Sequence, residues 1–280
     1  MTHDADLHLA DQRLRYSTAG SPTAPAVMLV HGFLSHRRVW RHLWPQLAER
    51  FYCVALDLLG FGESTKPATA DYSSLAQARR VLAVADAVGL DRFAVVGHSM
   101  GGQIALLLAI EAAPARIPRL VSVAGVVTGQ FTPIVDTVTY PQLLAGVWAP
   151  WLYAGWRQLA RQPHCGQAMF GSWFYQPQLL PFAAWAMDRE MALQPGIHWP
   201  AYQAGRALRG HSIAARLERI TAPTLLVAGR QDGIVPVTDS KLAARLLPGA
   251  RLLLLERCGH FPMLEQPHLL LEAIRDFLDS

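Results

Sequence analysis

The chain has 280 residues, of which 51% are hydrophobic and 16% charged, and its formal net charge at pH 7 is +4. This composition supports a packed core and argues against disorder, and the length fits one large α/β domain or a core with an insertion. The short basic cluster of Arg37, Arg38 and Arg41 lacks the interleaved aromatic residues of a nucleic-acid surface, so no nucleic-acid partner is expected.

The cysteines, the first residues and the longest uncharged stretch indicate the cellular compartment of the protein. Cys53, Cys165 and Cys258 are odd in number and widely spaced, which fits neither a disulfide framework nor a metal site. The first residues lack the basic and then apolar regions of a signal peptide. Residues 137–156 carry no charge, but their prolines and glycines break the helix that a bilayer crossing needs. We therefore predict a cytoplasmic protein with no stable membrane span.

Short apolar runs alternate with helical patterns along the chain, as in an α/β fold. Residues 7–16 alternate loosely in polarity, which predicts a hairpin that faces solvent. Most of the later apolar runs are continuous, which is typical of strands buried on both faces of a parallel sheet. These runs are residues 27–30, 51–56, 93–96, 120–124, 224–228 and 251–255. Helices that cover both faces of the sheet are predicted at residues 39–50, 72–88, 100–112, 239–247 and 265–279.

The alternation stops in residues 128–210, which hold six of the eight tryptophans and many prolines. Aromatic density without strand patterns predicts a helical cap over a pocket, inserted between core residues 1–127 and 211–280. A small cap cannot bury so many large apolar side chains unless some of them face the core and bind substrate. The predicted substrate-binding residues are Trp148, Trp151, Trp156, Trp173, Phe174, Trp185 and Met187, together with Phe261 of the core.

Residues Gly97-His98-Ser99-Met100-Gly101 form the pattern G-x-S-x-G between a predicted strand and a predicted helix. In this context the pattern predicts a nucleophile elbow, a sharp turn that holds the serine in a strained backbone conformation. Glycine is needed on both sides because a Cβ at either position would collide with the turn. Ser99 is therefore the candidate nucleophile.

A serine nucleophile needs a base, and the base needs a carboxylate that orients it. Asp232 follows the fifth of the apolar runs, and His260 follows the sixth. Both residues thus lie at the carboxyl ends of predicted strands, and the order serine, aspartate, histidine is the one expected after a nucleophile elbow. We predict His260 as the base and Asp232 as the acid, with Asp136 and Asp57 as less well placed alternatives for the acid.

Two backbone N–H groups are candidates for an oxyanion hole, the donor pair that stabilises the charged oxygen of an acyl-transfer intermediate. One belongs to Met100 at the start of a helix, and the other to Phe33 in the loop after an early strand. His31 is expected to hydrogen-bond that loop. The chain contains no CxxC, HExxH or acidic calcium-loop motif, and residues 59–62 lack the third glycine of a dinucleotide site. We therefore expect neither a metal nor another cofactor.

Taken together, these motifs resemble the α/β-hydrolase fold family, in the branch with a serine nucleophile and a helical cap. The likeness covers nearly the whole chain and rests on residues 31–33, 57–64, 97–102, 229–236 and 258–260. The resemblance implies an eight-stranded, mostly parallel sheet, with Ser99, Asp232 and His260 as catalytic triad.

The resemblance also narrows the reaction. Ser99 argues against haloalkane dehalogenases and epoxide hydrolases, which use aspartate as nucleophile. The C–C hydrolases of meta-cleavage products usually have asparagine before the serine and tryptophan after the histidine, where this chain has His98 and Phe261. We predict a carboxylesterase-like hydrolase that cleaves small-molecule esters, thioesters or lactones of apolar acyl or aromatic acids through an acyl-enzyme. The alternatives are such a C–C hydrolase and a non-catalytic protein that binds a small ligand.

Overall fold

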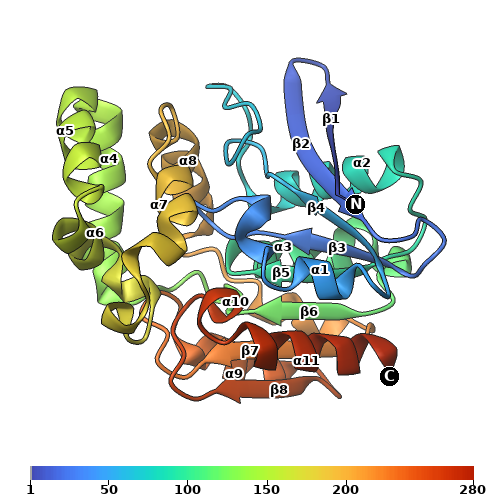
Figure 1. Ribbon diagram of the computed structural model, residues 1–280. Coiled ribbons are helices and arrows are strands. Elements are labelled where there is room, and N and C mark those ends of the chain that lie inside the picture. Colours follow the sequence, from blue (N-terminus) through green and yellow to red (C-terminus); the bar gives the residue numbers. More distant parts are fainter. Residues whose placement is uncertain (1) are drawn as a thin grey trace.

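The computed structural model describes residues 2–280, except for the side chains of Pro150, Leu179 and Phe182. Met1, the first residue of the predicted core, lies outside the described residues. The sheet has the strand order β1-β2-β4-β3-β5-β6-β7-β8 (Figure 1). Neighbours from β4 to β8 are parallel, whereas β2 is antiparallel to both β1 and β4. The predicted eight-stranded, mostly parallel sheet is confirmed. The strands are β1 (His3–Leu9), β2 (Gln12–Ala19), β3 (Ala26–Val30), β4 (Tyr52–Leu56), β5 (Ala94–His98), β6 (Leu120–Val123), β7 (Thr224–Gly229) and β8 (Arg251–Leu255).

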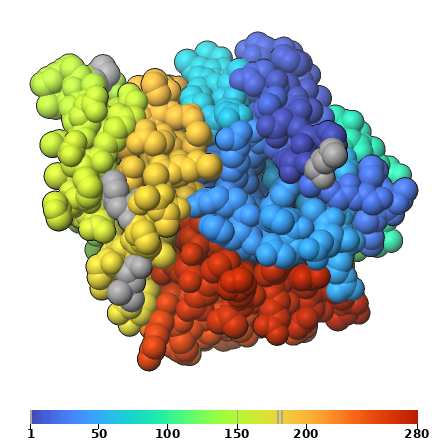
Figure 2. All heavy atoms as spheres, viewed as in Figure 1, coloured from blue at the N-terminus to red at the C-terminus, as the bar shows by residue number. Residues whose placement is uncertain are grey.

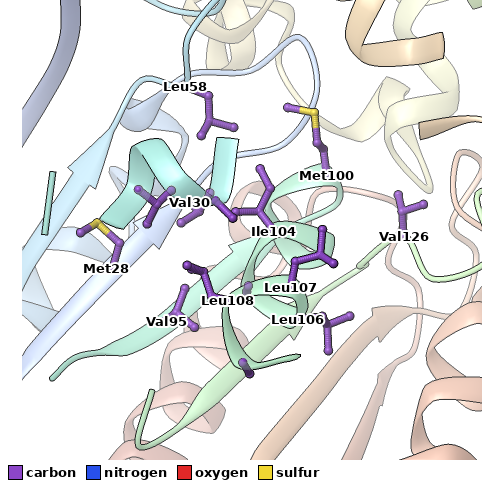
Figure 3. Packing of buried hydrophobic residues seen from close by; sticks show 14 of the residues in the cluster. Met28, Val30, Leu58, Val95, Met100, Ile104, Leu106, Leu107, Leu108 and Val126 are labelled. Atoms are coloured by element: carbon purple, nitrogen blue, oxygen red, sulfur yellow. The ribbon is translucent and has the colours of Figure 1, made fainter. Parts of the chain in front are cut away.

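Helices cover both faces of the sheet because the side chains of each strand alternate between two apolar layers. In β3, Met28 and Val30 belong to one layer, and Val27 and Leu29 to the other. The first layer includes residues of α2, α3 and α9, and the second includes residues of α1 and α11. Figure 3 shows side chains of α3, such as Ile104, within the first layer. These helices are α1 (Trp44–Leu47), α2 (Ser74–Ala87), α3 (Met100–Leu107), α9 (Val237–Leu246) and α11 (Pro267–Asp279), and α10 (Pro262–Glu265) precedes the last of them.

Three predicted helices differ from the observed elements. The helix predicted at residues 100–112 is α-helical to Leu107 and continues as a π-helical turn, Leu108–Ala112. In place of the helix predicted at residues 39–50, the chain forms a 3-10 turn, Arg37–Trp40, and then the short helix α1, which begins at Trp44 because Pro45 is tolerated only in the first turn of a helix. The last helix begins at Pro267 instead of residue 265, since this second proline starts a new helix after α10.

The chain between β6 and β7 is helical, and its described residues contain no strand. Its helices are α4 (Tyr140–Trp148), α5 (Pro150–Ala160), α6 (Pro163–Phe170), α7 (Ala186–Ala192) and α8 (His198–Leu208), which short 3-10 and π-helical turns accompany. Figures 1 and 2 show α4 and α5 at the outer edge of the molecule, with α7 and α8 between them and the sheet. Within residues 2–280, none of the helices has both the length and the apolar character needed to span a bilayer.

A buried carboxylate joins this helical segment to the sheet domain. Asp188 of α7 accepts a hydrogen bond from Arg41 at 2.8 Å and lies 3.2 Å from Nε2 of His36. Burial acts to raise the pKa of Asp188, but the hydrogen bonds from His36 and Arg41 bring this pKa below its ordinary value. The carboxylate therefore stays ionised and ties α7 to the loop after β3.

Candidate active site

Ser99 lies at the turn from β5 into α3, in a strained backbone conformation. Its φ is +55° and its ψ is −115°, a combination that residues with a side chain rarely adopt. A Cβ on Gly97 would collide with the backbone of Gly101, and a Cβ on Gly101 would collide with the carbonyl oxygen of Val30. The turn therefore needs both glycines, and it presents Ser99 at the carboxyl end of the sheet.

The loops after β7 and β8 meet through a buried hydrogen bond. Nδ1 of His260 lies 2.8 Å from Oδ2 of Asp232. The other oxygen of this carboxylate accepts the N–H groups of Ile234, at 2.8 Å, and Val235, at 2.9 Å. Since an ionised carboxylate only accepts, the Nδ1–H of His260 is the donor, and Nε2 is left free to take up a proton.

Ser99 and His260 line one pocket, which also contains Phe33 and Ile234. The space between its walls, with the open mouth included, is about 680 Å³. Asp232 is not part of the lining, since it contacts the imidazole from behind. Three loops at the carboxyl ends of β5, β7 and β8 thus bring together the serine, aspartate and histidine that the sequence singled out.

The two predicted oxyanion donors lie beside Ser99. Met100 is the first residue of α3, so its N–H has no acceptor within the helix. Phe33 lines the pocket, and its loop lies against the elbow, because a Cβ on Gly32 would be 3.0 Å from the Cβ of Ser99. Within residues 2–280, the N–H groups of Phe33 and Met100 donate to no backbone carbonyl. Both donors are therefore available to a ligand next to Ser99.

His31 is a buried structural residue of the Phe33 loop. Its Nδ1–H donates to the carbonyl oxygen of Gly32 at 2.7 Å, and its Nε2 accepts the N–H of Leu58 at 3.0 Å. Burial lowers the pKa of His31 to about 4. The folded protein therefore holds this ring in its neutral form.

We expect His31 to make the fold sensitive to acid. Its folded pKa is lowered from 6.5 to about 4, so the stability it contributes is present above pH 6.5 and is lost as the pH falls toward 4. Between pH 7 and pH 4.5 the wild type should lose about 2–3 kcal/mol more free energy of unfolding than His31→Gln, whose amide does not titrate. Urea unfolding at both pH values measures this difference. Equal losses in the two proteins would contradict the role of His31.

His98 connects the elbow to the loop of His260. Its Nε2–H donates to the carbonyl oxygen of His260 at 2.7 Å, and the centroids of the two rings are 4.7 Å apart. Burial brings the pKa of His98 well below its ordinary value. His98 therefore stays neutral and supports the loop.

The pocket wall differs from the one predicted. Two of the eight predicted substrate-binding residues, Trp173 and Phe261, line the pocket. Their rings stack with centroids 5.1 Å apart. Phe174 and Trp185 are buried behind them and contact each other at a centroid distance of 5.5 Å. Trp156 stacks on Tyr153 instead.

Three further substrate-binding predictions need correction, because the side chains lie away from the pocket. Trp148 is 80% exposed, Trp151 is 72% exposed and Met187 is 39% exposed. The first turn of α4 reaches the pocket through Tyr140. Trp148 follows Tyr140 by eight residues and therefore lies about 12 Å further along the helix axis, away from the pocket.

The rest of the wall includes residues that the sequence analysis missed. They come from the loop after β3, from residues 131–143, from α8 and from the loop after β7: Leu34, Phe131, Val135, Thr139, Tyr140, Leu143, Gly205, Leu208 and Ile234. Tyr140 and Leu143 are three residues apart and therefore share a helix face, a spacing that was readable in the sequence. Arg209 pairs with Asp136 at 2.7 Å and lies over the Tyr140 ring at 4.4 Å.

The two alternative candidates for the acid of the triad, Asp136 and Asp57, interact with groups other than His260. Asp136 pairs with Arg209, and Asp57 accepts hydrogen bonds from Arg37 and from the N–H of Glu63. Within the described residues, no group of three or more histidine, cysteine, aspartate or glutamate side chains has the arrangement of a metal site.

Known proteins resemble this chain along most of its length. Residues 25–267 match a family model described as alpha/beta hydrolase fold. The chain is 33% identical to a pimeloyl-[acyl-carrier protein] methyl ester esterase of Nitrosomonas europaea, over 87% of this chain and 91% of the relative. It is 28% identical to a 2-hydroxymuconate semialdehyde hydrolase of Pseudomonas sp. strain CF600, over 95% and 89%. The 2-hydroxy-6-oxo-6-phenylhexa-2,4-dienoate hydrolase of Rhodococcus sp. strain RHA1 has a similar structure, with a TM-score of 0.83 at 26% identity, covering 100% of this chain and 99% of that one.

Proposed function

The chain belongs to the α/β-hydrolase fold family and is a hydrolase of that fold, and we propose that it is a carboxylesterase-like serine hydrolase. In this proposal Ser99 is the nucleophile, His260 the base and Asp232 the acid that orients it. The observation that carries the proposal is the 2.8 Å hydrogen bond between Asp232 and His260, beside a pocket that Ser99 also lines. Residues 128–210 act as the cap of this pocket.

The proposed reaction passes through an acyl-enzyme. Oγ of Ser99 attacks the substrate carbonyl while Nε2 of His260 takes its proton. The N–H groups of Phe33 and Met100 stabilise the oxyanion, and such donors are each worth roughly 10²–10³ in rate. His260 then passes the proton to the leaving alcohol and afterwards deprotonates the water that releases the acid.

The pocket supports an apolar acyl or aryl group as the part of the substrate that it holds. Its wall includes Phe33, Leu143, Trp173 and Phe261, all apolar. Arg209 brings a guanidinium to this wall, but Asp136 already pairs with it. A negatively charged acyl group would have to displace that carboxylate, so neutral acyl groups should be preferred over anionic ones.

Specificity should rise with acyl length until the pocket is full. Across p-nitrophenyl acetate, butyrate, hexanoate and octanoate, each buried methylene adds roughly 0.8 kcal/mol, or about fourfold in kcat/KM. Leu143→Ala enlarges the pocket and should move the optimum to a longer chain, whereas Trp151→Ala, on the exposed corner of α5, should leave it unchanged. A steady fall in kcat/KM from acetate onward would show that the pocket does not accept an acyl chain.

C–C hydrolysis of a meta-cleavage product is the second candidate. Two of the relatives support it, since they are named as hydrolases of a muconate semialdehyde and of a phenylhexadienoate. Such acids carry a carboxylate, and Arg209 is the guanidinium on the pocket wall that would bind it. A vinylogous diketone acid tests this candidate: turnover faster than that of p-nitrophenyl butyrate, with a higher KM in Arg209→Gln, would favour C–C cleavage over ester cleavage.

A further inference from the structure

Glu265, the last residue of α10, bridges the loop of His260 and the helical segment. Its Oε1 accepts the N–H of Gly259 at 2.9 Å, and its Oε2 accepts the N–H of Tyr175 at 2.8 Å. Gly259 directly precedes His260, while Tyr175 follows the 3-10 turn Gly171–Trp173 of the helical segment. One carboxylate therefore binds two chain segments that are distant in the sequence.

The same two segments also meet through their backbones. The N–H of His260 donates to the carbonyl oxygen of Trp173 at 2.9 Å. A Cβ on Gly259 would lie 2.7 Å from the nitrogen of Tyr175 and 2.8 Å from the carbonyl carbon of Phe174, so the contact is too close for a side chain. The backbone of His260 is thus held from the cap side, while Asp232 holds its ring from the core side.

We propose that Glu265 is a positioning residue for His260, which keeps the loop of the base at the correct distance from Ser99. The proposal rests on the proposed function, in which His260 is the base. A carboxylate suits this role because both of its oxygens accept hydrogen bonds. A glutamine of the same size has one acceptor oxygen, and its NH₂ group would face an N–H donor.

Glu265 has an unusual electrostatic environment for a carboxylate. Burial is the main cause that raises its pKa, to about 6, and the charge of Asp232 adds to the increase. Hydrogen bonds with the backbone of Tyr175, Gly259 and Phe261 act in the opposite direction and lower this pKa. Burial, together with the charges of Glu265 and Asp232, also raises the pKa of the Cys258 thiol. At pH 8 Glu265 is ionised and accepts on both oxygens, whereas below pH 6 its protonated form loses an acceptor.

The test compares wild type, Glu265→Gln and Glu272→Gln, the last being an exposed glutamate of α11. At pH 8, with p-nitrophenyl butyrate, Glu265→Gln should lower kcat by roughly 10–100-fold and change KM by less than about threefold, because a small displacement of the base costs far more in rate than in substrate binding. Its kcat should also fall less steeply below pH 6 than that of the wild type. A purely structural role would lower the melting temperature and leave kcat and the pH profile of the folded enzyme unchanged.

A second measurement does not depend on turnover. The Nδ1 proton between His260 and Asp232 should give a downfield proton NMR resonance, which Glu265→Gln should shift or broaden and Glu272→Gln should preserve. If the wild type hydrolyses no ester, the proposed function fails, and this resonance still tests the positioning role. If Glu265→Gln does not fold, Glu265→Asp provides the comparison, since its shorter side chain cannot reach both donors. An unchanged resonance together with wild-type kcat in the folded variant would overturn the proposal.

Discussion

Ser99→Ala should abolish turnover and leave the fold intact. The substitution removes the Oγ that would form the acyl-enzyme, and loss of a serine nucleophile elsewhere costs about 10⁶ in kcat. Alanine keeps the Cβ that the strained turn already accommodates at φ +55°, so the melting temperature should change little. Hydrolysis of p-nitrophenyl butyrate and a thermal unfolding curve measure the two effects. Residual activity above a few per cent of wild type would rule out Ser99 as the nucleophile.

A serine-reactive fluorophosphonate provides a control that is independent of the substrate. It should label Ser99 in the wild type and in Ser212→Ala, an exposed serine outside the pocket, and should not label Ser99→Ala. A folded wild type that is neither labelled nor active on any ester would indicate a non-catalytic protein that binds a small ligand.

Asp232→Asn should lower kcat by about 10⁴, as in other triads. The amide oxygen can still accept the N–H groups of Ile234 and Val235, so the loop should keep its shape. The NH₂ group, however, would face Nδ1 of His260 and favour the tautomer with the proton on Nε2, which cannot accept the proton of Ser99. The expected result is therefore a folded enzyme with an intact nucleophile and a misoriented base.

The kcat of Asp232→Asn is compared with that of Asp136→Asn and of Asp276→Asn, an exposed residue of α11. Asp276→Asn should match the wild type. A loss of about 10⁴ in Asp136→Asn, with only a small loss in Asp232→Asn, would assign the acid to Asp136 instead.

The elbow was predictable from sequence because its geometry depends on steric contacts between residues that are close together in the chain. A strand, a G-x-S-x-G turn and a helix follow one another within a few residues, and only glycine fits beside the strained serine. The observed φ of Ser99 and the crowded surroundings of Gly97 and Gly101 agree with that reasoning. The parallel sheet was predictable for a related reason, since strands buried on both faces need continuous apolar runs.

Asp232 and His260 were predictable as candidates because parallel strands bring their carboxyl ends to one edge of the sheet. The hydrogen bonds of His98 and Glu265 were not readable, since each bond joins the side chain to a loop far away in the chain. Nothing in a sequence pattern gives the distance between a side chain and a distant backbone group.

The amino-acid sequence alone was enough to identify the elbow, the predicted strands that the candidate residues follow and the aromatic character of residues 128–210. The tertiary structure alone decided which of those aromatic side chains reach the pocket. Trp173 does, because its segment is bonded to the loop of His260, whereas Trp148 is carried to the surface at the far end of α4. Composition reports how much apolar surface a segment contains, but the length and packing of its helices determine where that surface points.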